Sequence, residues 1–170
     1  IQGAGKSSEV ARYTDAGYAR LNRDTLGGDL ASLIPKLHDL LSSGQKRVIL
    51  DNTYPTQISR FPVIQMAHSH GVPVRCRYMA TSIDDAYINV VHRFLERYEK
   101  LLGPEELKDL AKTDPNLPPP SAMVRWATCF EPPTEGEGFS VVDVIPFERR
   151  VDPMFTKKGL LLDVDGTIRS

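Results

Sequence analysis

The sequence predicts an α/β fold in which a doubly wound parallel sheet carries helices on both faces. Segments with the hydrophobic period of a strand alternate along the chain with segments that have the period of a helix. Such alternation favours parallel strands joined by crossover helices. With 170 residues, 41% of them hydrophobic, the chain is long enough for one ordinary domain with its own core.

The first half of the chain contains two expected strands with a helix between them. Residues 18–22 form a short strand, and leucine and isoleucine then recur at helical spacing over residues 29–41. Gly44 ends that helix. Residues 46–51 (KRVILD) are rich in β-branched and apolar side chains, which is typical of a buried parallel strand.

The second half repeats this order. We expect a helix over residues 56–70 and an alternating strand over 72–79. Ser82 and Asp85 form a capping box that opens a long amphipathic helix. Residues 139–145 form the last expected strand of the sheet.

Composition limits the class of protein and of partner. The net charge of -1 means that a polynucleotide would have to bind in a local basic groove. The two cysteines, Cys76 and Cys129, have no metal-ligand spacing, and we interpret them as reduced thiols, with a disulfide as the alternative. The sequence contains no apolar run of membrane-spanning length and no signal peptide. These features predict a soluble protein of the cytoplasm or nucleus.

The chain opens on the second half of a Walker A pattern, in which Gly-Lys-Ser/Thr ends the phosphate-binding loop. Glycines let backbone amides converge on a phosphate, and the helix that follows presents its N-terminus to the same anion. The first glycine of the pattern, and the strand that leads into it, would precede Ile1. We therefore expect the first strand of the sheet to lie outside this sequence. The nucleotide-binding prediction covers Gly3, Ala4, Gly5, Lys6, Ser7 and Ser8, with Lys6 on the β- and γ-phosphates and Ser7 on Mg²⁺.

Two acidic side chains follow expected strands, where ligands bind in such sheets. Asp24 has the right position for a general base that accepts the proton of a hydroxyl group. Asp51 follows the apolar run of its strand, as in a Walker B motif that holds Mg²⁺ or orients the acceptor. The alternatives are that Asp24 caps the next helix and that Asp51 and Asn52 form an Asx-turn.

The other end of the chain carries an Asp-x-Asp-Gly-Thr motif after three leucines. This motif resembles the nucleophile motif of haloacid-dehalogenase-type phosphatases. The resemblance implies that Asp163 is the nucleophile, that Asp165 is the acid/base, and that both contribute to a Mg²⁺ site. The other residues that such a phosphatase needs would lie on later strands, so we expect this domain to be incomplete here. A chance match is the alternative.

Four segments together resemble the kinase module of polynucleotide 5′-kinase/3′-phosphatases: GAGKSS, NRDTLG, DNTYPTQISR and FEPPTEGEGFS. The resemblance implies a P-loop kinase-type fold that uses ATP and Mg²⁺. It also implies that Asp24 is the general base for a 5′-hydroxyl group and that Asp51 positions the acceptor. The other implied acceptor contacts are Asn52, Thr53 and Arg60, and the implied lid arginines that contact ATP are Arg93 and Arg125.

The same resemblance implies a domain order. Residues 1–147 would form the kinase domain, residues 148–158 a linker, and residues 159–170 the first strand and motif of the phosphatase. Residues 103–133, which are charged and then rich in proline, break the strand–helix rhythm and are expected to form a mobile lid; a surface excursion without a role is the alternative. For Trp126, stacking on a base and packing within the lid both stay open.

The predicted function is therefore ATP-dependent phosphorylation of 5′-hydroxyl ends of DNA or RNA, coupled in the full-length protein to 3′-phosphatase activity for nucleic-acid end repair. Two alternatives stay open. One is a P-loop kinase for a small metabolite, which would use the same lysine and base. The other is a nucleotide-binding regulatory module, against which the intact Asp24 and Asp51 argue.

Overall fold

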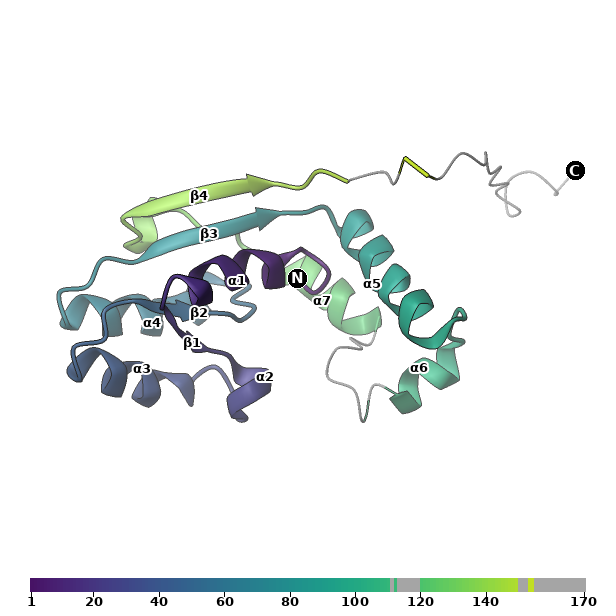
Figure 1. Ribbon diagram of the computed structural model, residues 1–170. Helices are drawn as coiled ribbons and strands as arrows, with labels where there is room; N and C mark the ends of the chain where they lie inside the picture. The colour runs from purple at the N-terminus through teal and green to yellow at the C-terminus, as the bar shows by residue number, and fades with distance from the viewer. Residues whose placement is uncertain (111, 113–119, 150–152, 155–170) are drawn as a thin grey trace, which may run out of the picture.

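The computed structural model describes residues 1–110, 112, 120–149 and 153–154, and it has an α/β architecture (Figure 1). The strands are β1 (Ala19–Leu21), β2 (Val48–Leu50), β3 (Arg75–Ala80) and β4 (Val141–Pro146). The helices are α1 (Lys6–Asp15), α2 (Arg23–Leu26), α3 (Leu33–Ser42), α4 (Gln57–Ser69), α5 (Ile83–Tyr98), α6 (Pro104–Leu110) and α7 (Pro120–Cys129), with a 3₁₀ turn η1 (Glu135–Glu137).

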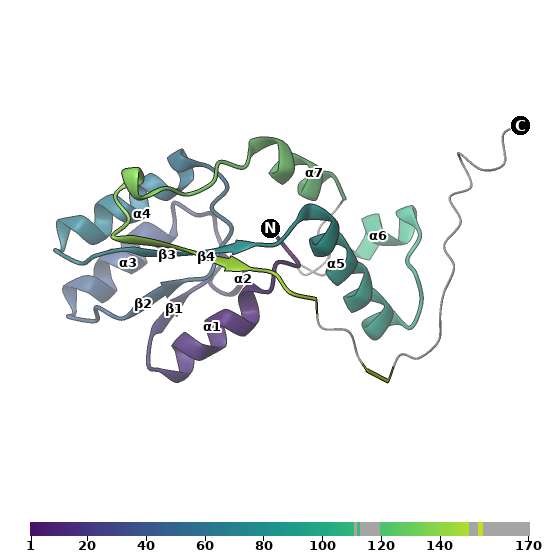
Figure 2. The same cartoon turned by 90° about the horizontal axis from the view of Figure 1, so that it is seen from above.

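The strands form two parallel pairs. β1 pairs with β2, so that Ala19 lies opposite Val48, and β3 pairs with β4, so that Arg75 lies opposite Val141. Both pairs are parallel because their connections contain helices, as the alternation in the sequence predicts. Figure 2 shows α1 and α4 on opposite sides of the strands, with α5 and α6 beyond the carboxyl end of β3.

Two apolar clusters hold these elements together. One joins β1, α3 and α4 through Leu21, Leu37, Leu41 and Val63. The other joins the N-terminal turn to α5 and α7, and its buried members are Ile1, Ala4, Ala86, Val90, Phe94 and Met123. The second cluster therefore fixes the N-terminal turn against α5.

Most expected elements are present, with ends shifted by a few residues. Ser82 caps α5 as expected, since its hydroxyl accepts the amide proton of Asp85 at 3.0 Å. The expected lid region contains α6 and α7, which the sequence analysis did not predict, and residues 111 and 113–119 lie outside the described ranges. Cys76 and Cys129 are free thiols. None of the helices in the described ranges has the length and apolar character that a bilayer-spanning helix requires.

Candidate phosphate-transfer site

Residues 1–5 form a tight turn, here called the P-loop turn, that leads directly into α1. Gly3 and Gly5 have φ angles of 81° and 87°, in the left-handed region that favours glycine. A Cβ atom on Gly3 would lie 2.4 Å from the carbonyl oxygen of Ala86, so only glycine fits there. Gly5 caps α1 without a side-chain hydrogen bond, which leaves the first amides of the helix available to an anion.

Lys6 lies at the centre of this region. Its ammonium group donates a hydrogen bond to the carbonyl oxygen of Ile1 at 2.8 Å. Burial lowers the pKa of Lys6; the charge of Asp51 opposes this shift, Arg93 adds to it, and Asp24 opposes it more weakly. The charges of Asp24, Asp51 and Arg93, which belong to three different parts of the chain, thus all influence the pKa of Lys6. Of these residues, Lys6 and Asp51 line the same cavity.

Asp51 is buried at the carboxyl end of β2, with 7% of its surface exposed. Its Oδ2 atom accepts hydrogen bonds from the guanidinium of Arg20, 3.0 Å from Nε, and from Asn22, 3.2 Å from Nδ2. Arg20 was missed in the sequence analysis; its place next to Ile49 in the parallel register aligns it with the end of β2. Within the described ranges, no three His, Cys, Asp or Glu side chains are grouped to hold a metal ion.

Asp24 lies in α2 with 58% of its side chain exposed, and its Oδ1 atom is 3.4 Å from a guanidinium nitrogen of Arg23. The cap of α2 is Asn22, whose Oδ1 atom accepts the amide proton of Thr25 at 3.0 Å. The alternative that Asp24 caps this helix is therefore wrong. Asn52 accepts the Arg23 amide proton at 2.8 Å and so fixes the turn that presents the Asp24 carboxylate to solvent.

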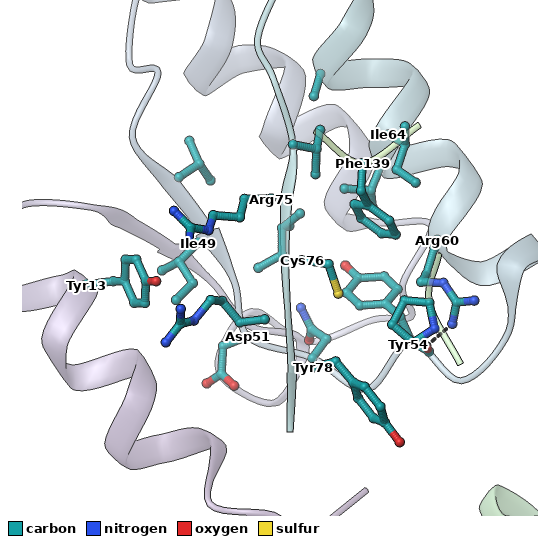
Figure 3. A pocket seen from close by; sticks show the side chains of 18 of the residues that line it. Tyr13, Ile49, Asp51, Tyr54, Arg60, Ile64, Arg75, Cys76, Tyr78 and Phe139 are labelled. Atoms are coloured by element: carbon teal, nitrogen blue, oxygen red, sulfur yellow. Dashed lines mark hydrogen bonds between the residues drawn. The ribbon is translucent and has the colours of Figure 1, made fainter. Parts of the chain in front are cut away.

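Arg60, an expected acceptor contact, is buried and bonded to protein groups at the wall of the cavity shown in Figure 3. Its Nε and Nη2 atoms lie 2.6 and 2.9 Å from the two carboxylate oxygens of Glu137. Its Nη1 atom donates to the carbonyl oxygen of Tyr54 at 3.1 Å (Figure 3). Arg60 thus ties the segment after β2, which contains Thr53, to the segment before β4.

Four more of the predicted residues are exposed to solvent. Ser7 and Ser8 are exposed on the first turn of α1, Arg93 is exposed on α5, and Arg125 is exposed on α7. The ring of Trp126 stacks on the ring of Phe130, with 4.3 Å between the ring centroids. Of the two interpretations of Trp126, this contact favours packing within the protein. Asp163, Asp165, the proposed phosphatase segment 159–170 and most of the linker lie outside the described residues.

A cavity of about 730 Å³ lies between the two strand pairs. Its lining includes Ile49 and Asp51 from the β2 segment, and Cys76 and Tyr78 from β3 (Figure 3). Lys6 and Asn52 line it as well, so the cavity adjoins the residues gathered around the P-loop turn.

Comparison with known proteins supports one relationship. A scan against models of protein families finds no match. The chain is similar to a protein of Schizosaccharomyces pombe named bifunctional polynucleotide phosphatase/kinase, with 29% identity over 146 residues. The match covers 85% of this chain but only 31% of the yeast protein. This similarity supports the relationship to the polynucleotide kinase family that the sequence motifs predict.

Proposed function

We propose that this chain is the kinase portion of an enzyme that phosphorylates 5′-hydroxyl ends of DNA or RNA, and that the full-length protein also carries a 3′-phosphatase. The observation that carries the proposal is the P-loop turn, in which Gly3 and Gly5 have left-handed φ angles ahead of the uncapped N-terminus of α1. Lys6, the first residue of α1, lines the same cavity as Asp51. The name of the yeast relative, which includes both polynucleotide activities, is consistent with the proposal.

The residues of the P-loop turn fit a nucleoside triphosphate with Mg²⁺. Gly3 and Gly5 have the conformations that let amides converge on a phosphate, and the N-terminus of α1 has no side-chain cap. When bound, ATP supplies the phosphoryl group, and Mg²⁺ offsets the charge of its phosphates. Lys6 and Ser7 would hold these groups, with Arg93 and Arg125 as further contacts from α5 and α7.

The other carboxylates have separate roles in this proposal. Asp24, which is exposed, accepts the proton of the 5′-hydroxyl group as that oxygen becomes a nucleophile. Asp51 is held by Arg20 and Asn22, so it orients the ends of β1 and β2 where the acceptor would bind. Arg60 stabilises the segment after β2 by donating a hydrogen bond to the carbonyl oxygen of Tyr54.

The proposed fold is a doubly wound P-loop sheet. It is supported by the cavity between β2 and β3, two strands that belong to separate parallel pairs. One further parallel strand between β2 and β3 would join the two pairs into a single sheet. The helices α1 and α4 already lie on opposite sides, as such a sheet requires (Figure 2).

The test is transfer of labelled phosphate from ATP to 5′-hydroxyl oligonucleotides of DNA and of RNA. We expect transfer to at least one of them. Binding of ATP with transfer only to small hydroxylated metabolites would favour the metabolite kinase, and binding without any transfer would favour a regulatory module. Either result would overturn the proposed function.

Replacing Asp24 by asparagine should lower kcat by about 10²-fold, because the amide keeps the shape of the side chain but cannot accept the proton. The affinity for ATP should change little, since the Asp24 carboxylate is exposed and, within the described part of the chain, is bonded to Arg23 in its own turn. Steady-state kinetics and nucleotide titration separate the two effects. A collapse of ATP affinity with kcat preserved would make Asp24 a nucleotide-binding residue.

The phosphatase half of the proposal rests on the sequence motif that contains Asp163. In the full-length protein, Asp163→Asn should abolish 3′-phosphatase activity and leave kinase activity intact, because the nucleophile belongs to a separate domain. Phosphate release from a 3′-phosphorylated oligonucleotide measures the first activity. Full phosphatase activity in the variant would rule out Asp163 as the nucleophile.

A further inference from the structure

Two carbonyl groups of the P-loop turn accept hydrogen bonds from side chains, one just before α5 and one in the second turn of α5. The amide of Asn89 donates to the carbonyl oxygen of Gly3 at 2.8 Å. The hydroxyl of Thr81 donates to the carbonyl oxygen of Ala4 at 3.1 Å, and Thr81 is only 7% exposed. Both hydrogen bonds join residues that lie far apart in the sequence, so the conformation of the turn depends on residues outside it.

Holding a carbonyl also aims the next amide. In a planar trans peptide the C=O of one residue and the N–H of the next point in opposite directions. Asn89 therefore turns the N–H of Ala4 away from α5, and Thr81 does the same for the N–H of Gly5. These are two of the amides that a phosphate would meet ahead of α1.

The turn has little freedom to rearrange against α5. Ala86 is fully buried, and its carbonyl oxygen would be 2.4 Å from a Cβ atom on Gly3. Asn89 lies one helical turn after Ala86, on the part of α5 that faces the P-loop turn. The contact with Ala86 and the hydrogen bonds from Thr81 and Asn89 thus restrain neighbouring peptide groups at Gly3 and Ala4.

Arg149 determines which end of the Asn89 amide faces Gly3. Its guanidinium donates to the Oδ1 atom of Asn89 at 3.2 Å and to the carboxylate of Asp85 at 2.8 Å. An amide has one accepting and one donating end, so a cation on the oxygen leaves the NH₂ group for the Gly3 carbonyl. Arg149 follows β4, within the segment predicted to be the linker.

We propose that Thr81 and Asn89 are positioning residues that aim the amides of Ala4 and Gly5 at the phosphates of a nucleotide, and that Arg149 couples the linker to this turn through Asn89. This inference rests on the proposed function, because it requires the P-loop turn to bind nucleotide phosphates.

Matched substitutions test the positioning role with ADP as the probe. Thr81→Val removes the hydroxyl with little change of shape, whereas Thr81→Ser keeps it. Asn89→Asp keeps the shape but loses the donor. We expect Thr81→Val and Asn89→Asp to weaken ADP binding about tenfold each, the scale of one hydrogen bond, and Thr81→Ser to stay within about twofold. Calorimetric titration gives the affinities, and thermal unfolding shows which variants are folded.

Arg149 supplies a test at an exposed position. Arg149→Gln should weaken ADP binding in the wild-type background but have no further effect on Asn89→Asp, since both act on one contact. The matched control is Arg12→Gln on α1, and its ADP affinity should not change. Among the described residues, the ion-pair partner of Arg12 is Glu9 at the surface. In ¹⁵N-labelled protein, ADP should shift the amide resonances of Ala4 and Gly5, and the shifts should be smaller in Arg149→Gln.

The outcomes separate the two proposals. A wild-type chain that binds no ADP would overturn both the proposed function and the positioning role. Normal ADP binding with equal affinities in Thr81→Val and Thr81→Ser, or additive losses in Arg149→Gln and Asn89→Asp, would overturn the positioning role alone and leave the kinase proposal standing.

Discussion

Breaking the buried pair between Arg60 and Glu137 should lower stability more than any other single change considered. Both side chains are at most 6% exposed, and two hydrogen bonds join them. Glu137→Gln would leave the Arg60 guanidinium buried without its counter-charge, at a cost of about 3–5 kcal/mol. In a domain of this size that corresponds to a fall in Tm of about 6–20 °C, measurable by thermal unfolding.

Two further variants define what this pair contributes. Glu105→Ala, which removes an exposed partner of Lys108, should change stability by less than about 0.5 kcal/mol. The double variant Arg60→Met with Glu137→Leu should recover most of the loss, because apolar groups of similar volume leave no unpaired charge. A Glu137→Gln variant as stable as Glu105→Ala would show that the pair is dispensable.

The pair also predicts a dependence on pH. Burial alone would raise the pKa of Glu137, but hydrogen bonds from Arg60 and the Thr134 amide, with the charge of Arg60, hold it below its usual value of 4.5. A lowered carboxylate pKa contributes stability that is fully present above 4.5 and is lost as pH falls through the folded-state pKa. The stability gap between wild type and Glu137→Gln should therefore narrow on acidification below about pH 4.5.

Replacing Lys6 by methionine should lower phosphate transfer by about 10²–10³-fold, the scale for loss of one charge-stabilising donor in a transfer reaction. Methionine keeps the apolar stem of the side chain, so the fold should survive. Lys36→Met on α3 is the control: Lys36 is an exposed lysine away from the proposed site, and its replacement should leave transfer unchanged. Unchanged transfer in Lys6→Met would rule out the P-loop lysine assignment.

The same substitution should preserve or raise stability. Burial lowers the pKa of Lys6, so the charged ammonium costs the folded state free energy that methionine does not. For a lowered lysine pKa, this cost is fully present below the folded-state pKa and disappears as pH rises toward 10.5. The Tm advantage of Lys6→Met should thus be largest near neutral pH and shrink in alkaline buffer.

Local patterns in the sequence predicted the elements well, and the reason is physical. The cap at Ser82 and the apolar run before Asp51 each depend on residues that are neighbours in the chain. The parallel pairing also followed, because strands separated by helices cannot form hairpins. The helix α7 was missed because proline and charged residues around it hid its period.

The candidate site was predictable only in part. Motifs selected Lys6, Asp24 and Asp51 because each stands beside a local signal: a glycine turn or the end of a strand. No such local signal marks the long-range contacts that hold the segments around the candidate site. Arg60 and Glu137 are 77 residues apart, and Asn89 is 86 residues from Gly3, so their partners emerge only when the chain has folded.

These separations also order the folding of the chain. The contact between Arg20 and Asp51 closes a loop of 31 residues. The contact between Val74 and Ser140, which directly precede β3 and β4, closes a loop of 66 residues. Because non-local pairs form slowly, we expect β1, β2 and α3 to assemble early and the β3–β4 pair late. The carbonyls of Gly3 and Ala4 find their partners across still longer separations, of 86 and 77 residues. We therefore expect a nascent chain to form much of its hydrophobic core before the P-loop turn takes its final shape. Under the proposed function, nucleotide binding would then report that folding is complete.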